Sequence, residues 1–249
     1  RQLATAVQAE SDVASALRDA QALGVGGPPL AGLHELLTSV RLVQADAHKW
    51  LKALDVAHKL QSGEEQRLLA LPAELRAHMD IDYQVGRLAL LSGDSLYYLD
   101  RKPEALAAYR RGAASFDKAL AHQPSNRKRI EGAIHAHWYL ASVRSELGDP
   151  KGALDDSDTA LRIVERLLQL DPDNLEARRI GEAVSGDRAG ILSAAGRHDD
   201  AIRLVESNLV VRGARITRQP DDAEALRDLA VPLRTLADIY ERKGDRVGA

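Results

Sequence analysis

The chain has 249 residues, of which 45% are hydrophobic but only 4% aromatic, so its core must be built from alanine and branched aliphatic side chains. The formal net charge is −3, which leaves no excess of positive charge to attract nucleic acid or an anionic membrane. The absence of cysteine excludes disulfides, thiolate metal sites and a cysteine nucleophile, and it fits a reducing or an oxidising compartment. No apolar run approaches the roughly 20 residues that cross a bilayer.

The chain opens with an amphipathic pattern. Apolar residues at helical spacing, among them Leu3, Val7 and Leu17, predict a helix over residues 2–22. The sequence GVGGPPL (24–30) then predicts a break. Since no initiator methionine is present, we expect the chain to be part of a longer protein, with a processed mature chain as the alternative. In a longer protein the first helix is alternatively a linker from an upstream domain.

A second helical region is predicted over 31–61, and Ser62-Gly63 and Pro72 are expected to interrupt the chain after it. We interpret residues 1–72 as an N-terminal helical cap or as degenerate repeat-like hairpins. The clear repeats follow this region.

Residues 73–249 carry a repeat of 48 residues, with about three full units and a truncated fourth. The columns that keep this step are Ala105, Ala153, Ala201 and Ala249; Pro124, Pro172 and Pro220; Gly148, Gly196 and Gly244; and Leu120, Leu168 and Ile216. A period of this length indicates one supersecondary unit stacked several times, that is, a solenoid.

Each unit contains two stretches with helical apolar spacing. A break such as LGDP (147–150) separates them, and a proline followed by Ser, Asp or Asn closes the unit. The glycine column fits the left-handed residue that ends a first helix. The candidate N-caps for the next first helix are the pairs Ser125-Asn126, Asp173-Asn174 and Asp221-Asp222. The helix pairs predicted in this way are 74–99 with 102–123, 126–147 with 150–170, and 174–195 with 198–218, followed by a last helix over 222–243.

Small residues recur where the two helices of a hairpin would cross. Gly93, Ala141, Ala189 and Ala237 form one such column, and the Ala105 column forms the other. Together with the Gly-Asp turns, these columns resemble the tetratricopeptide repeat over about residues 86–249. The resemblance implies an all-α, right-handed α-solenoid of antiparallel helix hairpins.

The repeat length departs from the family pattern, because the usual unit has 34 residues and this one has 48. The excess of 14 divides into two insertions of seven residues, which are close to two helical turns each. The chain therefore resembles a long-helix bacterial variant of the repeat. A HEAT-type array is the alternative, although it does not require the Gly-Asp turn and the small-residue columns together.

No pattern in the sequence specifies a reaction. His135 and His137 are two residues apart, so on a helix they point in nearly opposite directions and cannot share one metal ion. GVGG (24–27) follows no strand and precedes no Gly-Lys-Ser/Thr, which excludes a phosphate loop. We predict a protein that is not an enzyme and that has no metal site and no cofactor.

The resemblance implies that the first helices line a concave groove. In this chain the columns that match the family's groove positions differ from unit to unit. A ligand-binding surface would produce this difference, and so would neutral drift at exposed sites. The candidate groove residues are Arg87, Leu90, Asp94, Tyr97, His135, Trp138, Ser142, Arg234 and Asp238. The family's clamp for a C-terminal carboxylate is not expected, because the Lys and Asn that form it are absent from these columns.

The predicted function is a non-catalytic scaffold that binds a protein or peptide of unknown identity in this groove. The alternative is a regulatory or sensory segment of a larger bacterial signalling protein, either a kinase or a transcription regulator. Neither nucleic-acid binding nor direct membrane insertion of this fragment is expected. The sequence allows a homo-oligomer and does not fix the compartment. The chain belongs either in the bacterial cytoplasm or in the extracytoplasmic part of a membrane protein.

Overall fold

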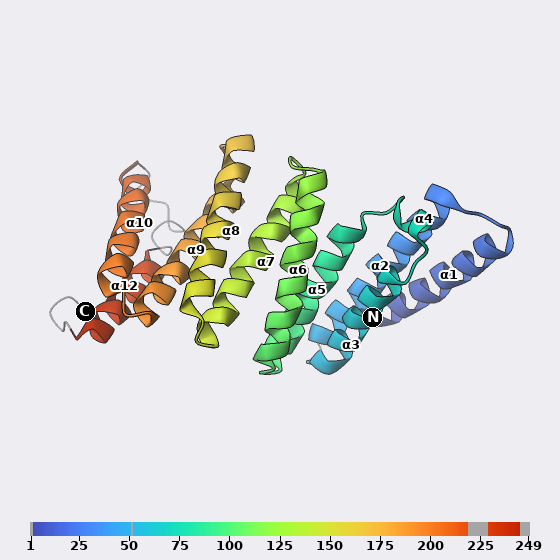
Figure 1. The fold of residues 1–249 in the computed structure, drawn as a ribbon, viewed down its shortest axis with the longest axis horizontal. Coiled ribbons are helices and arrows are strands. Elements are labelled where there is room, and N and C mark those ends of the chain that lie inside the picture. Colours follow the sequence, from blue (N-terminus) through green and yellow to red (C-terminus); the bar gives the residue numbers. More distant parts are fainter. Residues whose placement is uncertain (1, 51, 219–228, 245–249) are drawn as a thin grey trace. The chain divides into compact units, whose positions relative to one another are not determined.

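The computed structural model describes residues 2–50, 52–218 and 229–244, and their regular secondary structure is entirely helical (Figure 1). The helices are α1 (Gln2–Ala22), α2 (Gly27–Trp50), α3 (Leu54–Leu69), α4 (Ala73–Arg76), α5 (Ile81–Tyr98), α6 (Lys102–His122), α7 (Arg127–Glu146), α8 (Pro150–Leu170), α9 (Leu175–Ala194), α10 (His198–Arg218) and α12 (Ala230–Lys243). The all-α fold class predicted from the repeat is confirmed.

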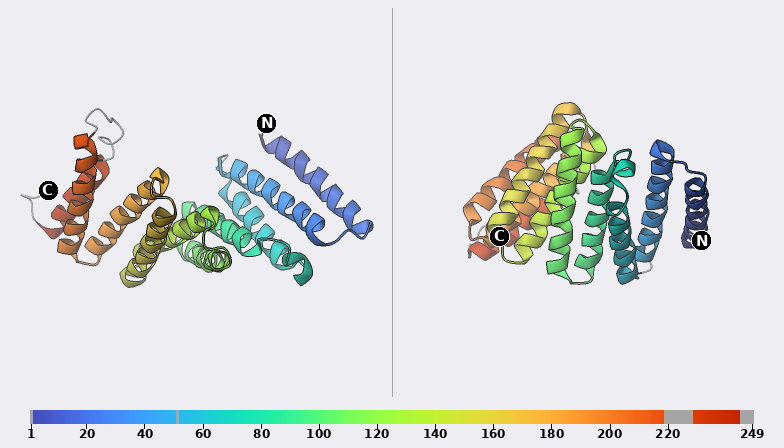
Figure 2. Two further views of the ribbon diagram at one scale, coloured as in Figure 1. Left: turned by 90° about the horizontal axis from the view of Figure 1, so that it is seen from above. Right: turned by 45° about the vertical axis from the view of Figure 1, so that its right-hand side comes forward.

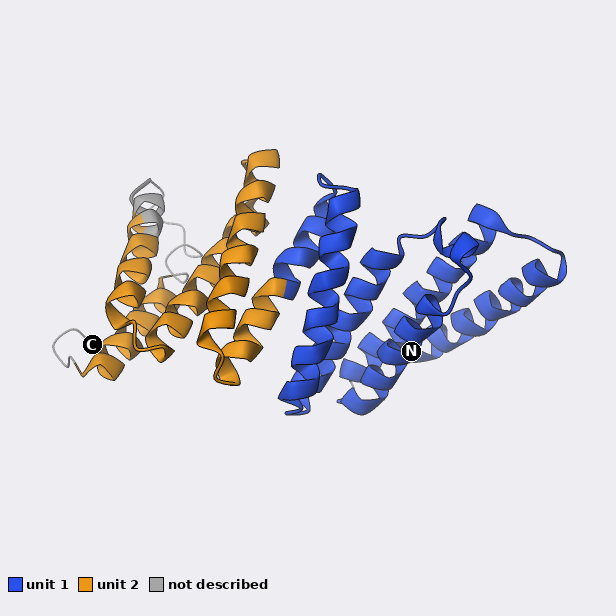
Figure 3. Cartoon of the chain, in the orientation of Figure 1, with its two compact units in different colours: residues 1–136 blue, residues 137–249 orange. Residues whose placement is uncertain are grey.

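The chain divides into two compact units, residues 1–136 and 137–249, which are coloured separately in Figure 3. In the first unit α1 packs on α2, α2 on α3, α3 on α5 and α5 on α6; in the second α8 packs on α9, α9 on α10 and α10 on α12. Figure 2 shows that these neighbours run antiparallel within each unit. Sequential antiparallel pairing is therefore the building principle of the fold. The boundary proposed at residue 72 stays a prediction.

A left-handed residue ends the first helix of each hairpin. The backbone angle φ is positive at Lys52 (59°), Asp100 (58°), Gly148 (80°), Gly196 (76°) and Gly244 (83°), and these positions are 48 residues apart. At the first four of these positions the next residue donates its N–H to the carbonyl five residues earlier, as Asp149 does to Arg144 at 2.9 Å, which is the hydrogen bond of a Schellman motif. The repeat of the turn thus extends back to the α2–α3 hairpin, where lysine replaces glycine.

The small-residue columns are largely buried where the helices of a hairpin pack together. Their members with no exposed surface are Ala57, Ala105, Ala153, Ala189 and Ala201. In the second unit Ala141 and Ala153 pack with Ile191, so methyl groups fill the space between the hairpin helices. In the first unit the ring of Phe116 lies against Gly86, where an added Cβ would be 3.0 Å from it. This packing explains how a chain with one phenylalanine builds a core.

Helix ends within residues 102–218 follow the prediction to within one residue, because local turn chemistry sets them. Asn174 caps α9 as expected, since its side-chain oxygen accepts the backbone N–H of Ala177 at 2.9 Å. At the start of α8, the side chain of Asp149 accepts from Gly152 at 2.9 Å in the same manner. Of the last predicted helix, residues 230–243 form α12, whereas 222–228 lie outside the described residues.

Three N-terminal expectations were wrong. The helical region 31–61 is two helices, because the chain turns at Lys52. Ser62 and Gly63 do not interrupt the chain but lie inside α3, whose packing on α2 and α5 outweighs the helix penalty of glycine. The helix predicted over 74–99 begins only at Ile81, after the short α4 and a turn. The turn and capping signals in the sequence are weak in this part of the chain, so packing between helices determines where each helix begins and ends.

Candidate protein-binding groove

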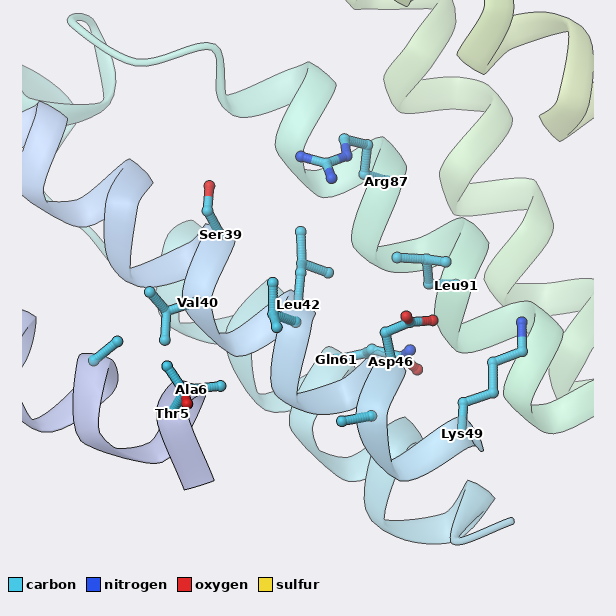
Figure 4. Close-up of a pocket in the computed structure, with 13 residues that line it drawn as sticks. Thr5, Ala6, Ser39, Val40, Leu42, Asp46, Lys49, Gln61, Arg87 and Leu91 are labelled. Atoms are coloured by element: carbon cyan, nitrogen blue, oxygen red, sulfur yellow. The ribbon is translucent and has the colours of Figure 1, made fainter. Parts of the chain in front are cut away.

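An open groove of about 860 Å³ lies in the first unit, among α1, α2, α3 and α5 (Figure 4). Its floor is α2, which contributes Val40, Val43 and Ala47. Ala9 on α1 borders the groove on one side and Leu91 on α5 on the other. The volume is within the range of about 300–1,000 Å³ that is usual for binding pockets.

The floor is apolar because α2 has hydrophobic residues on two of its faces. One face is buried against its neighbours through residues such as Ala31, Thr38 and Ala45. The opposite face is open, with 53% of Val43 and 49% of Leu36 exposed. Such an open apolar face on a well-packed helix is typical of an interaction surface.

A buried polar cluster fixes α1 and α3 against α2. The carboxylate of Glu64 on α3 has no exposed surface and accepts hydrogen bonds from Arg67 (2.5 Å), Arg41 (2.6 Å) and Thr38 (2.7 Å). Arg41 also donates to Glu10 on α1 at 2.9 Å. Burial alone would raise the pKa of Glu64, but these hydrogen bonds lower it below its ordinary value. The charged cluster therefore sets how α1 borders the groove.

Among the predicted site residues of the first unit, Arg87 lines the groove. Its guanidinium lies 5.7 Å from the Tyr83 ring centroid and donates to Gln84 at 3.3 Å, and no carboxylate of the described residues pairs with it. Asp94 is held by internal contacts instead: the Tyr109 hydroxyl donates to it at 2.9 Å, and Lys49 lies 3.5 Å away. Burial raises the pKa of Asp94, against the effect of these two partners.

Leu90, Tyr97 and His135 are half-buried in the same unit. The Tyr97 ring packs edge-on against Tyr98, with centroids 5.9 Å apart. His135 hydrogen-bonds the carbonyl of Glu131, one turn earlier on α7, at 2.8 Å. None of the three is among the residues that line the groove.

The remaining predicted residues belong to the second unit. The Trp138 indole N–H donates to Asp187 on α9 at 2.7 Å, and its ring packs on Tyr139. Ser142 donates to the Trp138 carbonyl at 3.2 Å. Arg234 and Asp238 are exposed on α12. A binding role for these four side chains stays a prediction.

The sequence did carry a signal for the part of the groove on α2. Subtracting one period of 48 from Arg87, Leu90, Asp94 and Tyr97 gives Ser39, Leu42, Asp46 and Lys49, and all four line the groove. These residues were missed because Lys52, in place of glycine, hides the turn that would have placed the α2–α3 hairpin in the repeat.

The described residues contain no group of three or more His, Asp or Glu side chains that could hold a metal ion. None of the described helices combines the length and the hydropathy that a membrane span requires. The arrangement therefore offers contact surface and a few charges. The prediction that the chain is not an enzyme stays a prediction.

No protein family and no curated protein matches the sequence of the chain. Among solved structures, BtubC (BKLC) from P. vanneervenii is similar, with a TM-score of 0.67 at 17% sequence identity. The match covers 100% of this chain and 85% of BtubC, a bacterial kinesin-light-chain-like protein that contains tetratricopeptide repeats. The chain therefore has a fold of sequential antiparallel helix pairs that is similar to the tetratricopeptide-repeat-like fold of BtubC.

Proposed function

We propose that the chain is a non-catalytic scaffold that binds a protein or peptide in the groove of its first unit. The observation that carries the proposal is the open groove itself: the four α2 residues one period before the predicted α5 positions line it, and Arg87 lines it from α5. The exposed apolar face of α2 supplies contact area, and the similarity to a tetratricopeptide-repeat-containing protein supports a protein partner.

A peptide library displayed on phage and selected on the purified chain tests this function. We expect enriched peptides whose affinity falls at least about tenfold when Val43→Asp places a charge on the groove floor. The matched control is Val210→Asp on α10, where valine is 73% exposed in the other unit. Peptides that lose affinity equally with both variants, or that ignore Val43→Asp, would refute the proposal.

The alternative role, as a regulatory or sensory segment of a larger bacterial signalling protein, remains a separate prediction. A kinase, winged-helix or membrane-spanning segment upstream in the full open reading frame would support it. An open reading frame with none of these segments would favour the scaffold role.

A further inference from the structure

The exposed face of α2 has the spacing of a coiled-coil seam. Leu36, Val40, Val43, Ala47 and Trp50 follow one another at intervals of four, three, four and three residues. At 3.6 residues per turn these side chains stay within about 40° of one line and extend over about 21 Å, or four turns. Leu36, Val43 and Trp50 are 49%, 53% and 81% exposed. The stripe thus occupies residues 36–50 of α2, where Val40, Val43 and Ala47 line the groove and the exposed Leu36 and Trp50 continue it at either end.

The occupant that matches this stripe is another α-helix. A partner helix with the same four-three spacing keeps its apolar side chains in contact with the stripe over all four turns. An extended strand has no such match, and the backbone groups of α2 are already hydrogen-bonded within the helix, which leaves no edge for strand pairing. Ala9 and Ala47 line the groove with small side chains, so a second helix has room to approach closely.

The charges beside the stripe define one flank of that partner. Arg87 on the α5 side has no carboxylate partner among the described residues, whereas Lys49 is engaged by Asp94 at 3.5 Å. Figure 4 shows Arg87 toward the Ser39 end of the groove and Asp46 with Lys49 toward the other end. A carboxylate on the partner is therefore favoured opposite Arg87, and disfavoured beside Asp46.

We propose that the groove binds an amphipathic helix of about four turns, with an apolar four-three stripe on α2 and a carboxylate facing Arg87. This inference rests on the proposed function and names the class of partner. Charge pairing sets the direction in which the partner helix lies, because Arg87 is at one end of the groove and Asp46 is at the other, where Lys49 is already paired with Asp94.

The test uses three synthetic peptides of about 21 residues and the full chain. The first has leucine at every stripe position, glutamate on one flank near one end, and a side-chain staple that holds it helical. The second replaces the glutamates with lysines. The third retains the glutamates but carries two central prolines in place of the staple, which break the helix. Fluorescence anisotropy measures the affinity of each at low and at physiological salt.

We expect the glutamate peptide to bind about tenfold more tightly than the lysine peptide, and Arg87→Glu to reverse that order. Arg110→Glu, at an exposed position on α6, is the matched control and should leave the preference unchanged. Val43→Asp should remove the binding of both stapled peptides. Circular dichroism and a thermal melt check that each variant folds. If Arg87→Glu unfolds, Arg87→Ala replaces it, and this variant should bind the glutamate and lysine peptides equally.

Equal affinity for the glutamate and lysine peptides would overturn the charge assignment, and equal binding of the proline peptide would overturn the helical partner. Self-association of the chain that Val43→Asp abolishes, without binding of any peptide, would assign the stripe to a second copy and reject the inference. Phage peptides that depend on Val43 but have no helical pattern would reject this inference and leave the proposed function standing. If the binding of no selected peptide depends on Val43, the proposed function and this inference are both rejected.

Discussion

The carboxylate of Glu64 is fully buried, and three side chains from α2 and α3 donate hydrogen bonds to it. Glu64→Gln removes the charge that balances Arg67 and Arg41, and breaking a buried ion pair in this way costs about 3 kcal/mol. We therefore expect a lower free energy of unfolding at pH 7, measured with urea. Glu104→Gln, at an exposed carboxylate that pairs with Arg101, should change it little. Equal effects would show that the cluster is not structural.

The same residue predicts a dependence on pH. Because the folded-state pKa of Glu64 is lowered from its ordinary value of 4.5, its contribution to stability is complete above pH 4.5 and is lost as the pH falls through the folded-state pKa. Urea unfolding between pH 5 and pH 3 should show a smaller loss of stability in Glu64→Gln than in the unmodified chain. Parallel curves for the two proteins would contradict the assignment.

At the scale of one helix, α9 has three interior glycines with different surroundings. An added Cβ at Gly186 or Gly190 would meet no atom within 4 Å, whereas at Gly181 it would lie 2.9 Å from a methyl group of Val164. Close packing thus explains Gly181 and leaves the other two as weak points of the helix. Gly186→Ala and Gly190→Ala should each stabilise the chain by about 1 kcal/mol, and Gly181→Ala should not.

Hydrogen exchange gives the corresponding dynamic test. We predict that amides over 181–192 exchange faster than those over 133–144 on α7, and that Gly186→Ala with Gly190→Ala slows the exchange over 181–192. Equal rates in the unmodified chain would reject a flexible point in α9.

The turn between two helices of a hairpin gives a second prediction at this scale. Asp100 has a φ of 58°, a region in which a Cβ costs about 1 kcal/mol, and glycine removes that cost. Asp100→Gly should therefore raise the free energy of unfolding, and Gly148→Ala, at a φ of 80°, should lower it. Chemical denaturation measures the free energy of unfolding of both variants. Lys102→Ala is the control, because it removes the exposed ion pair of Asp100 and leaves the turn residue in place. A loss of stability in Asp100→Gly would contradict the argument.

Across the whole molecule, packing distinguishes the columns of buried alanines from the partly exposed columns. Ala153 has no exposed surface and packs between helices, whereas Ser142 is half-buried on α7. Ala153→Leu should cost about 1–3 kcal/mol through overpacking, and Ser142→Leu should stay within about 0.5 kcal/mol. Thermal melts measure the melting temperature of each variant. Similar shifts in the two variants would mean that the two columns are not distinguished by packing.

The extent to which the fold could be predicted varies along the chain for a physical reason. Where Gly148 and Gly196 end helices, a single residue type reports the left-handed turn, and the predicted helix limits agree with the structure. At Lys52 and Asp100 the same left-handed turn forms without glycine, so the glycine pattern of the sequence does not mark it.

The groove could be predicted only in part. Arg87 follows from the repeat, because it is one 48-residue period before His135 on α7. The α1 side, including Thr5 and Ala9, could not be found, because long-range contacts place α1 beside α2, among them the charged cluster that joins Glu10, Arg41 and Glu64. Contacts between residues so far apart in sequence leave no trace in local spacing.

The two tryptophans make the chain its own optical reporter. Trp50 is at the end of the α2 stripe and is 81% exposed, while Trp138, in the other unit, donates to Asp187. In Trp138→Phe the remaining indole emission therefore comes from the rim of the proposed partner site alone. Docking of an apolar surface there would shift that emission to shorter wavelength, so occupancy can be followed in unlabelled protein, in real time and at the dilution that a tight complex requires.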